Sequence, residues 1–323
     1  MGKVFRSGAL ALIGLAATVA PVLTAATSSP AAGAATNAGA ATAGAAQAGA
    51  ATPHIRPGLY HLPIVGKVTL PGLGSSLGGV RHATAVQSSN WSGYADIDDT
   101  FNSVAASWTE PKASCGSTSG GLSGLLGGPS SAGAFWVGLD GYNSTSVEQL
   151  GTDSDCNGST PSYYAWYEMY PNPSVTLPNT VKPGDSITAW TSYSGSQFTL
   201  SIQDSTQGWT FSQPETGSFS RSSAEVIAEA PEECTTLFCS EVPLTNFGQV
   251  NFTGAKVFNA SGTSGGLSAF DAQEITMADS TTGTVEAQPS SLSSDGSAFS
   301  VTYKSSGGGG LSGLTLDGLG LGL

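Results

Sequence analysis

The stretch SSAEVIAEA (residues 222–230) carries two carboxylates on an otherwise apolar segment. In a β-strand alternate side chains share a face, so Glu225 and Glu229 would point the same way as Ile227. Either that face is wet, or a carboxylate is held there for proton transfer. We expect Glu225 to face a substrate groove, and the opposite face, which begins at Ala224, to pack in the core.

The positions of histidine limit the chemistry that is available. Of the 323 residues only His54, His61 and His82 are histidines, and none lies beyond residue 82. If the rest of the chain is the working unit, it lacks the imidazole of Ser-His-Asp and Cys-His catalysis and of His-ligated zinc. Carboxylates, amides, tyrosines and hydroxyls remain. The four cysteines include no C-x-x-C pair, so no metal or other cofactor is expected.

The charge is distributed unevenly along the chain. Residues 1–86 hold five Lys and Arg and no acidic residue, whereas residues 87–323 hold five Lys and Arg and all 23 Asp and Glu, a net charge of −18. Such an acidic body would repel phosphates, so nucleic acid is not an expected partner. It also indicates work at low pH, where carboxylates are neutral and self-repulsion falls.

The N-terminal region has the composition of an export and processing segment. Residues 1–26 resemble a secretory signal peptide, with Lys3 and Arg6 ahead of an apolar run. We therefore expect a secreted, extracellular protein, and no other stretch could span a membrane. Residues 27–86 form a low-complexity linker and a basic segment that we interpret as a propeptide.

The basic segment could inhibit the acidic body by docking on it near neutral pH. Release would follow as carboxylates protonate and the histidines of the segment become charged. The alternative is that the segment is only a spacer.

From residue 88 the chain consists of short β-like runs with no long helical periodicity. The expected strands are 90–97, 103–110, 134–139, 146–151, 162–170, 186–194, 198–204, 209–213, 223–230, 248–257, 274–278 and 297–304. A dozen short strands predict an all-β antiparallel sandwich or barrel over residues 87–304. Residues 305–323 are expected to be a disordered Gly- and Leu-rich tail.

Five motifs occur in order along this region: NWSGY, FWVGLDG, VEQLGTD, YYAWYEMYP and SAEVIAEAPEEC. Together, over about residues 88–304, they resemble the glutamic peptidases called eqolisins, which are secreted acid endopeptidases. The resemblance implies an antiparallel β-sandwich of two large, lectin-like sheets whose concave face binds a polypeptide substrate. It also implies a catalytic pair formed by Gln149 and Glu225.

Elementary chemistry is consistent with this pair. Glu225 as a carboxylate could take a proton from an attacking water and return it to the leaving amine, if its pKa lies near an acid working pH. Gln149 cannot move protons, but its NH₂ can donate to the developing oxyanion while its C=O orients the water. A neutral partner also avoids the second charge of an aspartic dyad.

The resemblance assigns further positions. Trp91, Trp136 and Tyr170 would line the groove, and four residues would support it through hydrogen bonds: Asp140, Asp153, Trp166 and Glu168. Asp140 could instead be a turn residue before a glycine, and Glu229 is taken as peripheral. The family pattern also implies a Cys234–Cys239 disulfide, which leaves Cys115–Cys156 by default.

The sequence departs from the family pattern at two positions. Val226 and Met169 replace the aromatic residues that are usual there, which puts subsite preference in doubt rather than the chemistry.

Two other functions remain open. Glu168 and Glu225 could be the carboxylate pair of a glycoside hydrolase, or the sandwich could bind sugars or peptides without catalysis. Neither explains the Gln in EQLGTD. Nothing indicates oligomerisation, so a monomer is expected, with its own propeptide as an intramolecular inhibitor.

Overall fold

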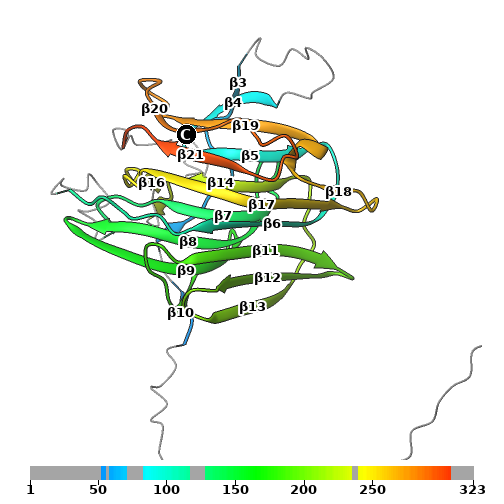
Figure 1. Cartoon of the computed structure of the whole chain (residues 1–323), viewed down its shortest axis with the longest axis horizontal. Coiled ribbons are helices and arrows are strands. Elements are labelled where there is room, and N and C mark those ends of the chain that lie inside the picture. Colours follow the sequence, from blue (N-terminus) through cyan, green and yellow to red (C-terminus); the bar gives the residue numbers. More distant parts are fainter. Residues whose placement is uncertain (1–51, 56–57, 71–82, 117–127, 235–238, 307–323) are drawn as a thin grey trace, which may run out of the picture. The chain divides into compact units, whose positions relative to one another are not determined.

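The computed structural model describes residues 52–55, 58–70, 83–116, 128–234 and 239–306 (Figure 1). The predicted signal peptide, nearly all of the linker and most of the C-terminal tail lie outside the described residues. All of the described residues belong to one compact unit. They contain a single turn of 3-10 helix, η1 (Leu267–Ala269), and otherwise β-strands, so the all-β prediction is confirmed.

Two layers of strands make up most of the molecule. The first has the hydrogen-bonded order β19 (Asp271–Ala278), β5 (Trp91–Ile97), β14 (Ala224–Glu229), β7 (Ala134–Leu139), β8 (Val147–Asn157), β9 (Thr160–Tyr170), β10 (Val175–Thr180) and β1 (His54–Ile55). The second has the order β13 (Trp209–Thr216), β12 (Gln197–Asp204), β11 (Ser186–Ser194), β6 (Phe101–Thr109), β17 (Gln249–Asn259), β21 (Phe299–Tyr303) and β20 (Val285–Pro289).

The two layers face each other and are joined at one edge. Strands β14 and β7 lie against β6, and β8 lies against β12. Pairing between β19 and β20 makes the hydrogen bonding continuous, so the layers belong to one 18-stranded sheet and not to two separate sheets as expected.

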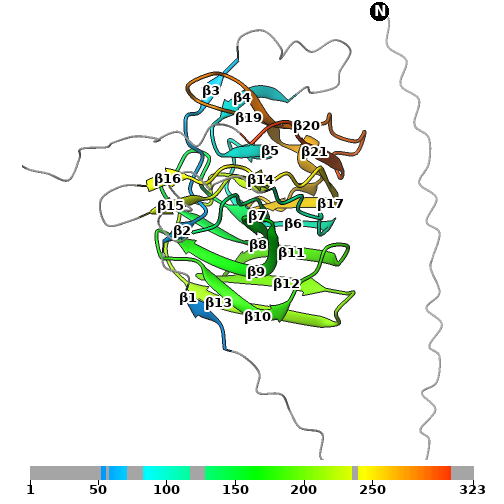
Figure 2. The same ribbon diagram turned by 90° about the vertical axis from the view of Figure 1, so that its left-hand side faces the viewer.

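Short strands complete the fold. Two of them extend the large sheet at β19: β4 (Thr84–Ser88), which pairs with β19 in parallel, and β3 (Val68–Thr69), which pairs with β4. β18 (Ser264–Gly265) pairs with β17. A separate sheet contains β2 (Leu59–Tyr60), β15 (Glu232–Cys234) and β16 (Cys239–Glu241), which Figure 2 shows beside one another.

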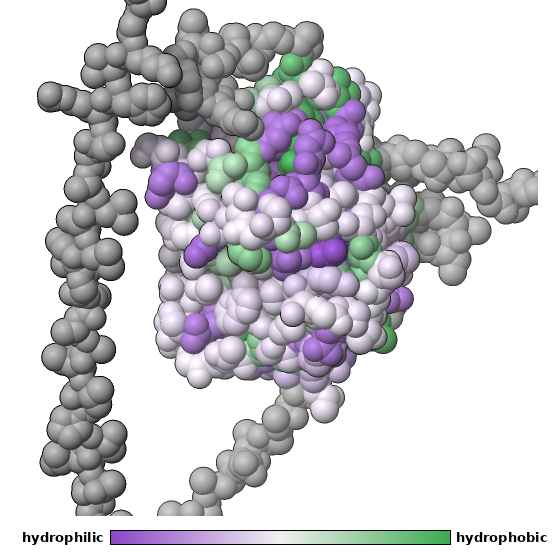
Figure 3. All heavy atoms as spheres, turned by 90° about the vertical axis from the view of Figure 1, so that its right-hand side faces the viewer, coloured by the Kyte–Doolittle hydropathy of each residue, from purple (hydrophilic) through white to green (hydrophobic). Residues whose placement is uncertain are grey.

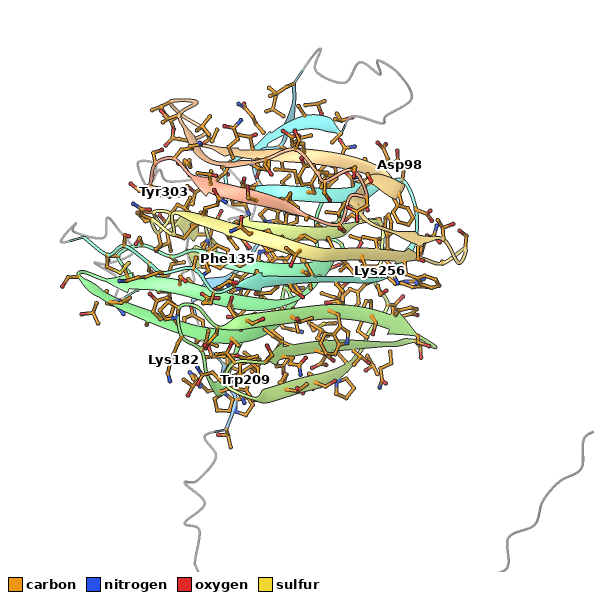
Figure 4. All side chains as sticks on the ribbon, viewed as in Figure 1. Asp98, Phe135, Lys182, Trp209, Lys256 and Tyr303 are labelled. Atoms are coloured by element: carbon orange, nitrogen blue, oxygen red, sulfur yellow. A yellow bond between two sulfur atoms is a disulfide. The ribbon has the colours of Figure 1, made fainter. Side chains whose placement is uncertain are left out.

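The main apolar core lies between the layers. It includes Val226 of β14, Phe135 of β7 and Phe252 of β17, all fully buried, and Figure 4 shows Phe135 near the middle of the molecule. The alternate residues of β14 face away from this core, where Ile227 joins a smaller cluster of buried aromatic residues. The predicted assignment of faces on this strand is therefore confirmed.

The disulfides have the expected pairing. Cys115 is bonded to Cys156, and Cys234 is bonded to Cys239. The first bond ties the segment after β6 to the end of β8, and the second closes the β15–β16 hairpin.

The described surface is polar or mixed. Large exposed apolar side chains are confined, within the described ranges, to Ile55, Val68 and Phe258, and the face in Figure 3 shows hydrophilic patches interspersed with small apolar ones. Among the described residues, no helix has the length and apolar character needed to cross a membrane.

Candidate active site

Four facing residues form a row across the first layer, on the side away from the main core. Glu225 of β14 is opposite Gly138 of β7, Gly138 is opposite Gln149 of β8, and Gln149 is opposite Glu168 of β9. Strands two apart are separated by about 10 Å, and Gly138 puts no side chain between Glu225 and Gln149. A Cβ at Gly138 would lie 3.0 Å from the Trp136 ring and 3.1 Å from Gln149 Cβ. Gly138 therefore adds no side chain to the row, and the side chains of Trp136, Gln149 and Val147 approach its position.

Glu225 is completely buried, and neither carboxylate oxygen has a partner at full hydrogen-bond geometry among the described residues, although the Ser223 hydroxyl lies close enough to lower the pKa of Glu225. Burial raises the pKa of Glu225 well above its ordinary value, and the charges of Asp140 and Glu148 reinforce this effect. An unpaired buried carboxyl is costly to stability. Such a cost is typical of a group kept for chemistry rather than for packing.

Gln149 is also fully buried, and its two amide atoms have different surroundings. Nε2 donates to Glu168 Oε2 at 3.1 Å and to the backbone oxygen of His61 at 2.5 Å. Oε1 has no partner among the described residues. The amide is thus oriented with its donor side on a peptide carbonyl and its acceptor side unoccupied.

The carbonyl belongs to an N-terminal segment, residues 59–65, that covers this face of the sheet. The buried imidazole of His61 stacks on Trp166, with 3.5 Å between the ring centroids. Its Nε2 lies 3.2 Å from Asp153 Oδ1, and its Nδ1 lies 3.1 Å from Glu168 Oε2. The backbone N–H of His61 also donates to Glu168 Oε2 at 3.0 Å.

The electrostatics of this pocket favour the charged imidazolium. Burial alone would lower the pKa of His61, but the charges and hydrogen bonds of Asp153 and Glu168 outweigh burial and raise the pKa to about 10. His61 is therefore charged throughout the acid range. Charging of His61 therefore strengthens its contacts with ionised Asp153 and Glu168, and release of the segment in acid stays a prediction.

Beyond His61 the segment continues across the sheet towards β5. The Leu62 oxygen accepts a hydrogen bond from Trp91 Nε1 at 2.9 Å, and the Val65 N–H donates to Asn90 Oδ1 at 2.8 Å. Trp91 in turn packs edge-on against Trp136, with 5.0 Å between the ring centroids. The segment therefore lies across the strands, as an extended ligand of this face would.

Several other side chains hold the site together. Asp153 accepts hydrogen bonds from Trp166 Nε1 at 2.7 Å and from the Tyr164 hydroxyl at 2.5 Å. Glu229 Oε2 accepts from Trp136 Nε1 at 2.7 Å. These bonds fix the two indoles that lie beneath the covering segment.

Two of the predicted residues lie at the margin of this face. Asp140 has the left-handed φ of 69° and accepts backbone hydrogen bonds from Arg221 and Ser222, just before β14. These hydrogen bonds hold the loop that leads to Glu225, and the role of Asp140 as a supporting residue of the site stays a prediction. Tyr170 is partly buried at the end of β9, edge-on to Tyr60 at 6.3 Å.

Six of the other predicted residues come together at the segment: Trp91, Trp136, Gln149, Asp153, Trp166 and Glu168. Glu225 lies on the same face, in the row of Gln149. Sequence reasoning missed His61, Asn90 and Tyr164, and it set Glu229 aside. Glu229 could have been found from its strand face, which it shares with Glu225. Among the described residues, the one group with metal-ligand spacing is Glu232 with Cys234 and Cys239, and its cysteines are joined in a disulfide.

Comparison with known proteins gives the same identification as the motifs. A profile described as the peptidase A4 family matches residues 89–303. The chain belongs to the peptidase A4 family. Aspergillopepsin-2 of Aspergillus niger is 32% identical over 232 residues, which cover 67% of this chain and 74% of that protein.

Scytalidopepsin B of Scytalidium lignicola is 36% identical over 191 residues, or 55% of this chain. The match spans 66% of that relative, just under two thirds of its length. A crystal structure of scytalido-glutamic peptidase with a transition state analogue inhibitor aligns with a TM-score of 0.57 and 30% identity, covering 67% of this chain and 98% of that one. The family and the all-β antiparallel fold expected from the sequence are confirmed.

Proposed function

We propose that this chain is a secreted glutamic endopeptidase that acts at acid pH, with Glu225 and Gln149 as its catalytic pair. One observation carries the proposal: Gln149 Nε2 donates to a backbone carbonyl on the face of the sheet that also carries the carboxyl of Glu225, with only Gly138 between the two residues in the row. A peptide bond bound like the covering segment would be exposed to both groups.

In the reaction, Glu225 as a carboxylate takes a proton from a water that attacks the peptide carbonyl carbon. Gln149 Nε2 donates to the oxygen on which negative charge develops, and Oε1 orients the water. Glu225 then returns the proton to the leaving amine. Burial of the covered site raises the pKa of Glu225, and this pKa would fall towards its ordinary range once solvent enters. Because Glu225 must be ionised to act as a base, catalysis in acid requires an open site.

The aromatic residues around the pair are the natural substrate contacts. Trp91 offers an indole N–H to a backbone carbonyl, and Trp166 offers a flat stacking surface beside the carboxylates of Asp153 and Glu168. We expect Trp136 and Tyr170 to contribute apolar walls. Together they would bind an extended polypeptide.

The covering segment supports the further proposal that residues 27–86 include an inhibitory propeptide. It occupies the face on which a substrate would bind, and it fills the donor position of Gln149 with its own carbonyl. The contacts of His61 with Asp153 and Glu168 are the specific form of the basic-on-acidic docking expected from the charge distribution. Release by protonation of those carboxylates stays a prediction.

A glycoside hydrolase that uses Glu168 and Glu225 is less compatible with the geometry. Their strands lie three apart, a backbone separation of about 14 Å, whereas such carboxyl pairs are about 5–10 Å apart. That mechanism also has no role for Gln149 between them.

The test is hydrolysis of a denatured protein substrate at acid pH by the purified chain and four variants. Loss of activity is expected in Glu225→Gln and Gln149→Ala. The matched controls Glu215→Gln and Gln203→Ala, both in the second layer away from the site, should retain it. Full activity in Gln149→Ala would exclude the proposed pair, and cleavage of glycans without proteolysis would favour the carbohydrate alternative.

A further inference from the structure

We propose that the first bond cut by this enzyme is its own His61–Leu62 peptide bond, and that the cut is made within the same molecule. The inference rests on the proposed function and names its first substrate. It assigns the maturation site, which the sequence alone did not.

The carbonyl side of this bond is bound as a scissile carbonyl would be. The His61 oxygen is 2.5 Å from Gln149 Nε2, the group that would stabilise an oxyanion formed on that oxygen. The imidazole and the backbone N–H of the same residue are fixed by Asp153 and Glu168, and the ring stacks on Trp166. Three kinds of contact thus hold one residue in one position.

The amine side is held by Trp91, which lies opposite Glu229 at the end of β14 away from Glu225. The Leu62 oxygen accepts from Trp91 Nε1 on β5, whereas the His61 oxygen lies at Gln149 on β8. Strand order places β14 and β7 between β5 and β8. The segment that joins these two residues therefore crosses β7 and β14, the strand that carries Glu225.

The neighbouring bond on the C-terminal side is not presented in this way. The Leu62 carbonyl is bonded to an indole N–H and not to Gln149, and the nitrogen that follows it belongs to Pro63. The contacts therefore single out the bond between His61 and Leu62.

The step balances as an ordinary hydrolysis. The water oxygen bonds to the His61 carbonyl carbon as Glu225 takes a water proton. The C–N bond to Leu62 then breaks, and the Leu62 nitrogen receives that proton as it leaves. The products are a carboxyl group on His61 and an amine on Leu62.

The cut also explains how the pocket could empty. The new carboxyl group would form beside the carboxyl groups of Asp153 and Glu168 that contact the imidazole. Added like charge in a buried pocket disfavours the bound state. The two halves of the segment would then be free to leave separately.

The experiment starts from the full chain purified at neutral pH. The chain is acidified over a hundredfold range of protein concentration, and the products are followed by intact mass and N-terminal sequencing. The earliest new N-terminus should be Leu62, and its rate of appearance should be independent of concentration. The Glu225→Gln chain should show no such product. His61→Ala, which leaves residues 62–323 unchanged, should lose most of the cleavage at position 62.

Each alternative result would overturn the inference. An earliest N-terminus other than Leu62, a rate proportional to concentration, or an unchanged Leu62 product in His61→Ala contradicts it. Acid hydrolysis of an added protein substrate is measured in the same samples. If that activity is present while the Leu62 product is absent, only the inference fails, and if both are absent the proposed function fails as well.

Discussion

Replacing His61 with Gln should loosen the covering segment in acid but not in alkali. The change is made in the Glu225→Gln chain, so that the segment stays covalently attached. Gln keeps hydrogen-bonding atoms but cannot carry charge. The imidazolium lies between Asp153 and Glu168, so the variant removes the positive partner of both.

The magnitude follows from the pKa of His61, which docking raises from 6.5 to about 10. At about 1.4 kcal/mol for each pH unit, this corresponds to at most about 5 kcal/mol of docking free energy. Because the docked pKa is the higher one, the contribution is complete below pH 6.5 and is lost as the pH rises through 10. Opening of the segment should therefore increase on substitution by up to roughly a thousandfold at pH 6.5, and hardly at all above pH 10.

The assay is the rate at which an added broad-specificity serine protease cleaves the segment, at pH 6.5 and at pH 10.5. His54→Gln makes the same chemical change at an exposed histidine of β1 and corrects for the pH dependence of the added protease. Equal effects of His61→Gln at both pH values would refute the reasoning, because a merely steric role does not titrate.

Three further predictions concern the site and the fold. Gly138→Ala should lower kcat/KM on an acid peptide assay by about a hundredfold with the fold intact, because the added methyl meets Gln149, and unchanged kcat/KM would contradict this. Glu110 is fully buried and burial raises its pKa to about 8, so it contributes stability below pH 4.5 that is lost as the pH rises through 8. In urea unfolding, Glu110→Gln should remove up to about 5 kcal/mol of that pH dependence, and an unaltered slope would count against it. Removal of the Cys115–Cys156 disulfide, whose cysteines are 41 residues apart, should cost about 4 kcal/mol by urea unfolding, and a loss below about 1 kcal/mol would exclude the chain-entropy argument.

Most strands could be predicted because the alternation of apolar and polar residues along a strand is a local sequence pattern. The expected strand at 134–139 coincides with β7, and that at 186–194 coincides with β11. Two of the missed strands, β10 and β20, each contain a proline, which lowers strand propensity. Others, such as β15 and β16, are only three residues long. β8 extends six residues beyond its expected end, through Thr152, Asp, Ser, Cys and Asn157, because it is paired throughout with β9.

The site was predictable only in part, because a local sequence pattern reveals strand faces but not contacts between distant segments. Alternation along residues 222–230 was enough to assign the faces of Glu225 and Val226, and both assignments are confirmed. His61 could not be found in this way, because its partners Asp153 and Glu168 are 92 and 107 residues distant in the chain. No local pattern encodes a contact that depends on how a separate segment crosses the finished sheet.

The covering segment is part of the same polypeptide as the site that it fills, and this has a consequence for how activity could be controlled. A tethered ligand has an effective concentration set by its linker, in the millimolar range for short flexible linkers, whatever the amount of protein present. Dilution into the surroundings of a cell would therefore not unmask the face that residues 59–65 occupy. Once the chain is cut within that segment, the released part becomes an ordinary solute and its occupancy falls with its concentration. Hydrolysis of a single peptide bond would thus convert inhibition that is independent of protein concentration into inhibition that is lost on dilution.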